Sequence, residues 1–254
     1  MSASERPVDS DKVWTTLITN LAYLPGLLTL DHSLRKVNSK YPLVALRVPY
    51  LLPTKSRDYS NDPRFYDCWT KLTPFSLTEY SRVVQLDSDM LKKHYPADWV
   101  PQHCAFTSQH PTPEEAQTVG ADPAVGPLGF MNGGLQVVNP SQALYAQILA
   151  HMEAGAVDMD FADQSLLSDL YRGRWVALPY TYNALKTLRW EGVHDAIWRD
   201  DEVKNIHYIL SPKPWDEVDE NGEWTGTEES HRWWVDSNRE RRAAEKEKGI
   251  DDGF

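Results

Sequence analysis

Two carboxylates stand two residues apart at the end of a predicted strand, in the segment Val83-Val84-Gln85-Leu86-Asp87-Ser88-Asp89. Side chains at positions i and i+2 of an extended backbone point to the same side, so Asp87 and Asp89 can converge on one cation. Carboxylate oxygens suit hard divalent ions such as Mg²⁺ and Mn²⁺, and a substrate diphosphate can fill the open coordination positions. The pair alone does not identify a metal site, because most D-x-D pairs are turn residues or solvated charges.

Three other places in the chain carry residues that suit such a site. His207, in a predicted strand over 203–210, is a natural third ligand for the ion, and a packed core histidine is the alternative. The glycines after Asn132 permit close backbone approach to a ligand before a predicted strand over 135–138, and a simple turn is the alternative. Asp163 precedes a predicted helix over 164–170, where an N-cap role alone explains an acidic residue.

The elements that must position these residues begin with a predicted strand over 13–19, a helix over 25–37 and a strand over 41–48. This order opens a parallel α/β sheet, and ligands bind at the carboxyl ends of the strands in such sheets. Thr19, Asn20 and Tyr23 lie at that end of the first strand, and Tyr23 is alternatively a packing residue at the entry to the helix. The other predicted elements are a helical stretch over 65–81 broken near Pro74, a helix over 140–154, a short strand over 175–178, a loop over 179–183, and a charged helix over 228–248. Within the stretch over 65–81, the local sequence favours a solvated Lys71.

Composition limits the classes of partner. The 254 residues suffice for one large domain. A net charge of −11 argues against a nucleic-acid partner, yet it permits a small phosphorylated ligand held by a metal. Two cysteines give no disulfide framework, the amino-terminal residues are unlike a signal peptide, and no apolar run reaches membrane-spanning length. We therefore expect a cytoplasmic protein without a membrane partner.

Seven short blocks in order resemble the family-8 glycosyltransferases, the family of glycogenin and the galactinol synthases, across residues 13–216. The sequence after Asn132 is most similar to the galactinol-synthase-like, fungal-type branch. The matching blocks are Leu17-Ile18-Thr19-Asn20-Leu21-Ala22-Tyr23; Thr70-Lys71-Leu72; Leu77-Thr78-Glu79-Tyr80-Ser81 with Asp87-Ser88-Asp89; Asn132-Gly133-Gly134 with Asn139-Pro140-Ser141; Asp160-Phe161-Ala162-Asp163-Gln164; Leu178-Pro179-Tyr180 with Tyr182-Asn183; and His207-Tyr208 with Lys213-Pro214-Trp215.

This resemblance implies a GT-A-like α/β fold over residues 12–216, with a mixed, mostly parallel sheet flanked by helices, followed by a charged, partly helical extension over 217–254. It also implies a role for each matching residue. Asp87, Asp89 and His207 would hold Mn²⁺ (or Mg²⁺). Leu17, Thr19, Asn20 and Tyr23 would surround the uridine, Lys71 and Lys213 would meet the diphosphate or sugar, and Ser88, Asn132, Gly133, Gly134, Asp160, Asp163 and Gln164 would contact the substrate. Asp163, Gln164 and Lys213 are the residues expected to take part in catalysis, with Asp163 first of all positioning the substrate.

The resemblance implies an enzyme that transfers a hexose from UDP-glucose or UDP-galactose to a polyol, a glycan or a protein. It would retain the configuration at the anomeric carbon. The alternatives are a nucleotide-sugar-binding pseudoenzyme and, from the aspartates alone, a metal-dependent phosphohydrolase. Segments near 48–64 and after 91 are shorter than the family pattern, and Leu210 stands where a glycogenin-like turn carries glycine. The shortened segments motivate the pseudoenzyme alternative. Trp233, Trp234 and the charged tail are candidates for a homodimer interface.

Overall fold

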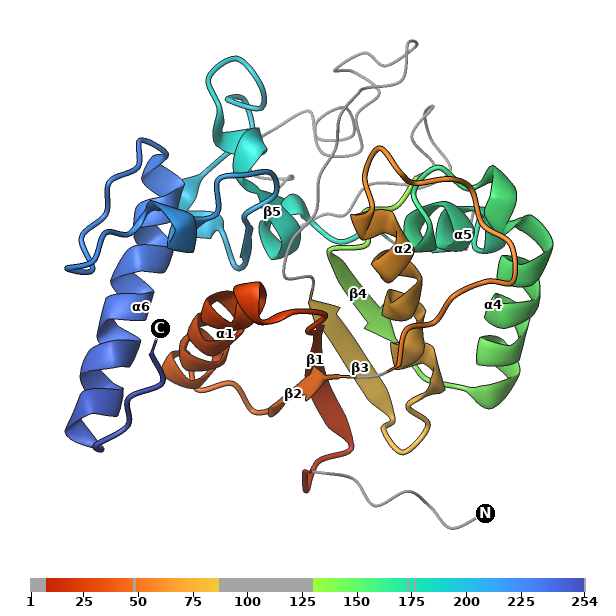
Figure 1. Cartoon of the computed structure of the whole chain (residues 1–254), viewed down its shortest axis with the longest axis horizontal. Helices are drawn as coiled ribbons and strands as arrows, with labels where there is room; N and C mark the ends of the chain where they lie inside the picture. Colours follow the sequence, from red (N-terminus) through yellow and green to blue (C-terminus); the bar gives the residue numbers. More distant parts are fainter. Residues whose placement is uncertain (1–7, 48, 87–129, 173, 176, 254) are drawn as a thin grey trace.

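A four-stranded sheet forms the centre of the molecule in the computed structural model, which describes residues 8–47, 49–86, 130–172, 174–175 and 177–253 (Figure 1). Its strands are β1 (Lys12–Leu17), β2 (Leu43–Leu46), β3 (Arg82–Leu86) and β4 (Leu135–Val138), in the order β2-β1-β3-β4. β1 pairs in parallel with both β2 and β3, whereas β4 is antiparallel to β3. The predicted mixed, mostly parallel sheet is confirmed.

Helices pack in two groups around this sheet. They are α1 (Leu24–Lys36), α2 (Arg64–Cys68), α4 (Gln142–Gly155), α5 (Asp163–Leu170) and α6 (Glu229–Glu247), with the 3₁₀ segments η1 (Leu21–Tyr23), η2 (Trp69–Ser76), η4 (Ala156–Asp158), η5 (Tyr180–Asn183), η6 (Lys186–Arg189), η7 (Asp200–Glu202) and η8 (Pro214–Glu217). The last helix, α6, packs against α1, while α4 packs against α5 and η2 (Figure 1). The sheet is therefore covered by chain segments from both ends of the sequence.

Burial on both faces explains the composition of the central strand. Thr15 and Thr16 are adjacent, so their side chains point to opposite faces of the sheet, yet both are buried. A parallel strand covered on both faces is expected to lack polar–apolar alternation, and β-branched residues fit its pleated surface.

The largest hydrophobic cluster joins η2, β4, α4 and α5, and includes the fully buried side chains of Trp69, Leu72, Ile148 and Leu166. Burying such side chains contributes about 1.5–3 kcal/mol each before the entropy of ordering is counted. This cluster supports the amino-terminal end of α5, which carries two of the predicted site residues.

Several predicted elements are corrected. The strand predicted over 175–178 is wrong for its described residues, because Trp175, Ala177 and Leu178 pair with no described strand. The strand predicted over 203–210 shortens to β6 (Ile206–His207), which pairs in parallel with β5 (Ala184–Leu185) in a separate two-stranded sheet. The backbone N–H of Ile209 donates to the carbonyl of His207 (3.0 Å), so the chain turns directly after β6.

Other boundaries differ by smaller amounts. The first two strands are shorter than predicted, and the helical stretch predicted over 65–81 ends at Ser76 and is largely 3₁₀ in its second half. The loop predicted over 179–183 contains η5. Residues 49–63 form neither helix nor strand, so no further sheet element stands between β2 and α2 in this described stretch.

Candidate functional site

The ends of the strands bring the predicted site residues to one edge of the sheet. β1 ends at Leu17 and β3 at Leu86, and the two strands run in the same direction. Leu135 of antiparallel β4 pairs with Leu86, so the segment just before β4 begins at the same edge. Asn132, Gly133 and Gly134 therefore lie beside the end of β3. Asp87, Ser88 and Asp89 follow Leu86 and lie outside the described residues.

A chain of side-chain amides connects this segment to His207. The backbone N–H of Gly134 donates to Oδ1 of Asn132 (2.9 Å), which also accepts from Nδ2 of Asn183 (2.8 Å). Oδ1 of Asn183 in turn lies 2.9 Å from Nδ1 of His207. A backbone N–H can only donate, so it fixes the orientation of both amides in sequence. Because the oxygen of Asn183 can only accept, Nδ1 of His207 carries the proton.

In this tautomer the second ring nitrogen of His207, Nε2, carries no proton. Its lone pair can accept a hydrogen bond or bind a metal ion. The side chain is buried (4% exposed), and Nε2 has no hydrogen-bond partner among the described residues. Burial, together with the positive charges of Lys71 and Lys213, lowers the pKa of His207 to about 3. The imidazole is therefore neutral at physiological pH, and its orphaned Nε2 fits the third metal ligand that the sequence predicts.

The two predicted lysines lie near this imidazole. Lys71 is buried in η2, at 7% exposure, so its interpretation as a solvated helix residue is wrong. Lys213 is also buried, and its Nζ donates to the carbonyl oxygens of Tyr208 (2.7 Å) and Leu210 (2.6 Å). Both ammonium groups act electrostatically on His207. The structure thus brings together a neutral imidazole and two lysine ammonium groups.

The turn between His207 and Lys213 has an unusual backbone. Leu210 has φ +65°, in the left-handed region that favours glycine. The resemblance predicts glycine at this position, and Leu210 adopts a conformation that glycine reaches without steric cost. Leu210 presents its carbonyl to Lys213 from this conformation.

The start of α5 faces the glycine turn. Asp163 is not the N-cap, as capping alone suggested: Ala162, with φ +43°, precedes the helix, and Asp163 is its first residue with 1% exposure. Gln164 Oε1 accepts a hydrogen bond from the backbone N–H of Gly133 (2.9 Å). A Cβ on Gly133 would lie 2.8 Å from Asp163 Oδ2. The close approach of these segments explains why a residue without a side chain is needed there.

The remaining predicted residues are less closely gathered. Leu17 is buried at the end of β1, and Asn20 caps η1 by accepting from Ala22 N (2.9 Å). Tyr23 makes an edge-to-face contact with Trp215, with ring centroids 6.1 Å apart. Asp160 is exposed and pairs with Arg57 at 2.6 Å. Thr19, which ends the first predicted strand, lies just beyond β1.

Sequence reasoning missed two groups of residues that support this site. One is Asn183, for which only the block Tyr182-Asn183 gave a signal. The other is a buried network in which Lys186 Nζ donates to the carbonyl of Pro212 (3.1 Å) and lies 2.9 Å from Nε2 of His231. His231 Nδ1 lies 2.6 Å from Glu217 Oε2. The network ties α6 and η6 to the turn that carries Lys213.

Replacing Gly134 with alanine is expected to disturb the site directly. The new Cβ would lie 2.5 Å from His207 Cε1, 2.6 Å from its Nδ1 and 2.9 Å from Asn132 Oδ1. The His207 ring is buried and hydrogen-bonded to Asn183, so moving it would break that hydrogen bond and disturb its packing. Overpacking of this kind costs about 1–3 kcal/mol, which urea unfolding would measure.

Gly155→Ala is the matched control, because its Cβ would meet only the terminal methyl of Met159, at 3.1 Å. That methyl is flexible and can move aside at small cost. Equal losses in free energy of unfolding for the two variants would contradict the packing described around His207.

The chain is similar in sequence to two groups of known proteins. The chain is 26% identical to glycogenin from Neurospora crassa over 258 residues, and 27% identical to glycogenin-1 from Mus musculus over 237 residues. It is 23% identical to galactinol synthase 1 from Arabidopsis thaliana over 251 residues. These alignments cover 91%, 81% and 82% of the chain, respectively. The chain is a homologue of the glycogenins and galactinol synthases. No protein-family model matches it.

The shared length differs among these homologues. The chain spans 36% of the Neurospora glycogenin, 66% of the mouse glycogenin-1 and 72% of the Arabidopsis galactinol synthase. Among solved structures, the bifunctional glycosyltransferase WbbM in its apo form matches with a TM-score of 0.51 and 17% identity, over 94% of this chain and 50% of that one. This likeness supports the GT-A-like α/β fold.

None of the described helices is both long and apolar enough to cross a membrane. Within the same residues, no three side chains of His, Cys, Asp or Glu gather as a metal site. His207 is thus the one of the three predicted ligands that the structure describes, and Asp87 and Asp89 lie outside it.

Proposed function

We propose that the chain is a retaining hexosyltransferase that moves glucose or galactose from a UDP-sugar to a polyol, glycan or protein, with Mn²⁺ (or Mg²⁺) as its cofactor. The observation that carries the proposal is the neutral His207, with Nε2 unprotonated, at the edge where β3 leads into Asp87-Ser88-Asp89. The homology to glycogenins and galactinol synthases supports the reaction class.

The residues of the chain suit the chemistry of this transfer. Negative charge grows on the UDP diphosphate as the bond to the anomeric carbon breaks, and a bound divalent ion would supply Lewis-acid stabilisation of that charge. Lys71 and Lys213 would hold the diphosphate and add positive charge where the negative charge develops. Asp163 and Gln164, buried beside Gly133, would orient the sugar.

A nucleotide-sugar-binding protein without turnover is the second candidate. The observation behind it is the irregular stretch 49–63, where the family pattern has a further helix and strand. Such a protein would share the donor site but release no UDP. The two candidates therefore differ in turnover and not in binding.

A thermal melt with UDP and Mn²⁺, against an EDTA control, is the first test. A ligand at 100 times its dissociation constant stabilises the native state by about 2.7 kcal/mol, which corresponds to about 5–10 °C for a chain of this size. We expect this rise only when both ligands are present. Incubation with UDP-glucose and UDP-galactose should then release UDP.

Each other outcome has a separate meaning. A rise in melting temperature without UDP release supports the binding protein. Release of UMP and a sugar phosphate would mean attack at phosphorus and a phosphohydrolase. No rise in the presence of both ligands would overturn the proposed donor site.

A further inference from the structure

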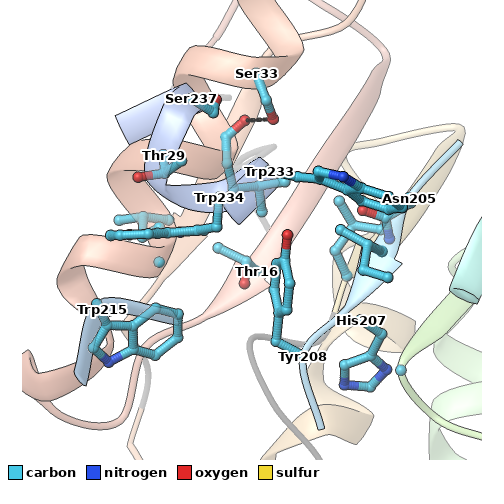
Figure 2. A pocket seen from close by; sticks show the side chains of 16 residues that line it. Thr16, Thr29, Ser33, Asn205, His207, Tyr208, Trp215, Trp233, Trp234 and Ser237 are labelled. Atoms are coloured by element: carbon cyan, nitrogen blue, oxygen red, sulfur yellow. Dashed lines mark hydrogen bonds between the residues drawn. The ribbon is translucent and has the colours of Figure 1, made fainter. Parts of the chain in front are cut away.

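A cavity lies behind the candidate site, between α1, β1, β6, η8 and α6 (Figure 2). Its volume is about 240 Å³. Figure 2 shows Trp215, Trp234 and Thr29 on one side and Tyr208 and His207 on the other. The cavity meets the candidate site at one wall only, and most of its lining comes from residues to which the proposed transfer gives no role.

The described part of the lining is mostly apolar and carries no formal charge. Three indole side chains, Trp215, Trp233 and Trp234, face it together with Leu27 and Leu30. Among the described residues that line it, none is Asp, Glu, Lys or Arg. An ionised ligand would lose its hydration there without gaining a countercharge, so the occupant is uncharged.

Besides Nε2 of His207, which belongs to the candidate site, two polar atoms of the lining lack a hydrogen-bond partner in the described structure. They are Oγ1 of Thr16, whose side chain is 1% exposed, and Nε1 of Trp234, whose side chain is 6% exposed. An unmade hydrogen bond of a buried group costs about 1–3 kcal/mol. Thr16 lies amid the residues that surround the cavity, where an occupant could bond to its hydroxyl (Figure 2).

Three other hydroxyls of the lining are already engaged as donors. Thr29 donates to Asn238 Oδ1 (3.1 Å), Ser33 to the carbonyl of Leu30 (2.7 Å), and Tyr208 to the carbonyl of Ser230 (3.1 Å). A sugar, with a hydroxyl on nearly every carbon, would bring more hydroxyls into the cavity than the described lining has polar atoms without a partner. A ligand with one hydroxyl would satisfy Thr16 and Trp234 and bury the rest of its surface against indole and leucine.

The volume of the cavity fits an occupant with a single ring. An engineered apolar cavity of about 150 Å³ in another protein binds benzene, and one water occupies about 30 Å³ of liquid. We propose that the cavity lined by Thr16, Trp215 and Trp234 is a second ligand site, separate from the donor site, for an uncharged single-ring alcohol or phenol. Its hydroxyl accepts from Trp234 Nε1 and bonds to Thr16 Oγ1, and its ring packs against the indoles.

The probe for this site is phenol, titrated in EDTA without UDP, so the result does not depend on the donor site or on turnover. We expect phenol to raise the melting temperature and to shift the indole N–H resonance of Trp234, assigned with Trp234→Phe. Benzoate, which is charged, and methyl glucoside, which is polyhydroxylated, should bind more weakly than phenol. Failure of phenol to bind, or tighter binding of either comparison molecule, would overturn the proposal.

Two variants of adjacent threonines isolate the hydroxyl. Thr16→Val and Thr15→Val remove the same group from the same buried strand, and neither hydroxyl has a hydrogen-bond partner in the described structure. Only Thr16 lines the cavity. Relative to benzene, the affinity for phenol should fall about three- to tenfold in Thr16→Val, and it should stay unchanged in Thr15→Val. Equal effects of the two variants would exclude the site.

Filling the cavity is an independent check. Ser237 of α6 lines it and is small, so Ser237→Leu should exclude phenol and benzene alike. The isosteric threonine variants keep the proposal falsifiable if this larger change prevents folding. Phenol binding by a folded Ser237→Leu variant with wild-type affinity would place the bound phenol elsewhere on the protein.

Discussion

Replacing Asp87 or Asp89 with asparagine is expected to abolish the joint stabilisation by UDP and Mn²⁺. The amide keeps the size of the side chain but loses the negative charge that a hard divalent ion requires. At ligand concentrations that stabilise the wild type by about 2.7 kcal/mol, each variant should lose the whole rise of about 5–10 °C. The melt in EDTA should match that of the wild type in EDTA.

The control is the same chemical change on an exposed residue. Asp31 of α1 pairs with Arg35 one helical turn away (2.7 Å), and an exposed pair of this kind contributes at most about 1 kcal/mol. Asp31→Asn should therefore keep the full response to UDP and Mn²⁺. Wild-type binding of both ligands by the Asp87 and Asp89 variants would show that the ion is held elsewhere.

Features that depend on neighbouring residues were predictable from the sequence. The β-branched runs of β1 and β3 predicted the central strands, and the charged, Trp-containing pattern predicted α6. The edge of the sheet followed from strand order, because parallel strands end on the same side. The strand expected over 175–178 was wrong because a hydrophobic run forms a strand only where another strand pairs with it.

Features that depend on distant contacts were not predictable. Lys71 is buried through packing of η2 in the core, which its local sequence does not reveal. The amide chain joins Asn132 to Asn183 across 51 positions, and Asn183 to His207 across 24. The tautomer of His207 depends on both contacts, so no periodicity or spacing could indicate it.

Leu210 shows how the two kinds of information combine. The sequence marked the position, because a leucine stands where a glycogenin-like turn carries glycine. The structure adds that the residue has φ +65° and that its carbonyl accepts from Lys213. A left-handed leucine costs about 1–2 kcal/mol relative to the right-handed form. Contacts of the turn must offset that cost, and they include hydrogen bonds from Lys186 Nζ to the carbonyl of Pro212 and from Lys213 Nζ to that of Leu210.

Replacing Asn183 with leucine is expected to weaken Mn²⁺ binding about 10- to 100-fold, which is about 1.4–2.7 kcal/mol. The variant removes the acceptor that keeps the proton on Nδ1 of His207, so the ring can rotate or carry the proton on Nε2. It also leaves Asn132 without one of its two donors. Calorimetric titration with Mn²⁺ at saturating UDP measures the loss, and the affinity for UDP in EDTA should not change.

Asn183→Asp separates orientation of the ligand from stability of the fold. A carboxylate still accepts a hydrogen bond from the Nδ1–H group of His207, and carboxylates commonly orient metal-binding histidines in this way. Its other oxygen would face Oδ1 of Asn132, which is also an acceptor, so this variant should lose free energy of unfolding. We therefore expect Asn183→Asp to be the less stable protein and yet to bind Mn²⁺ more tightly than Asn183→Leu. If metal affinity instead follows stability across the two variants, Asn183 supports the fold alone, and the orientation of His207 is set by the packing around it.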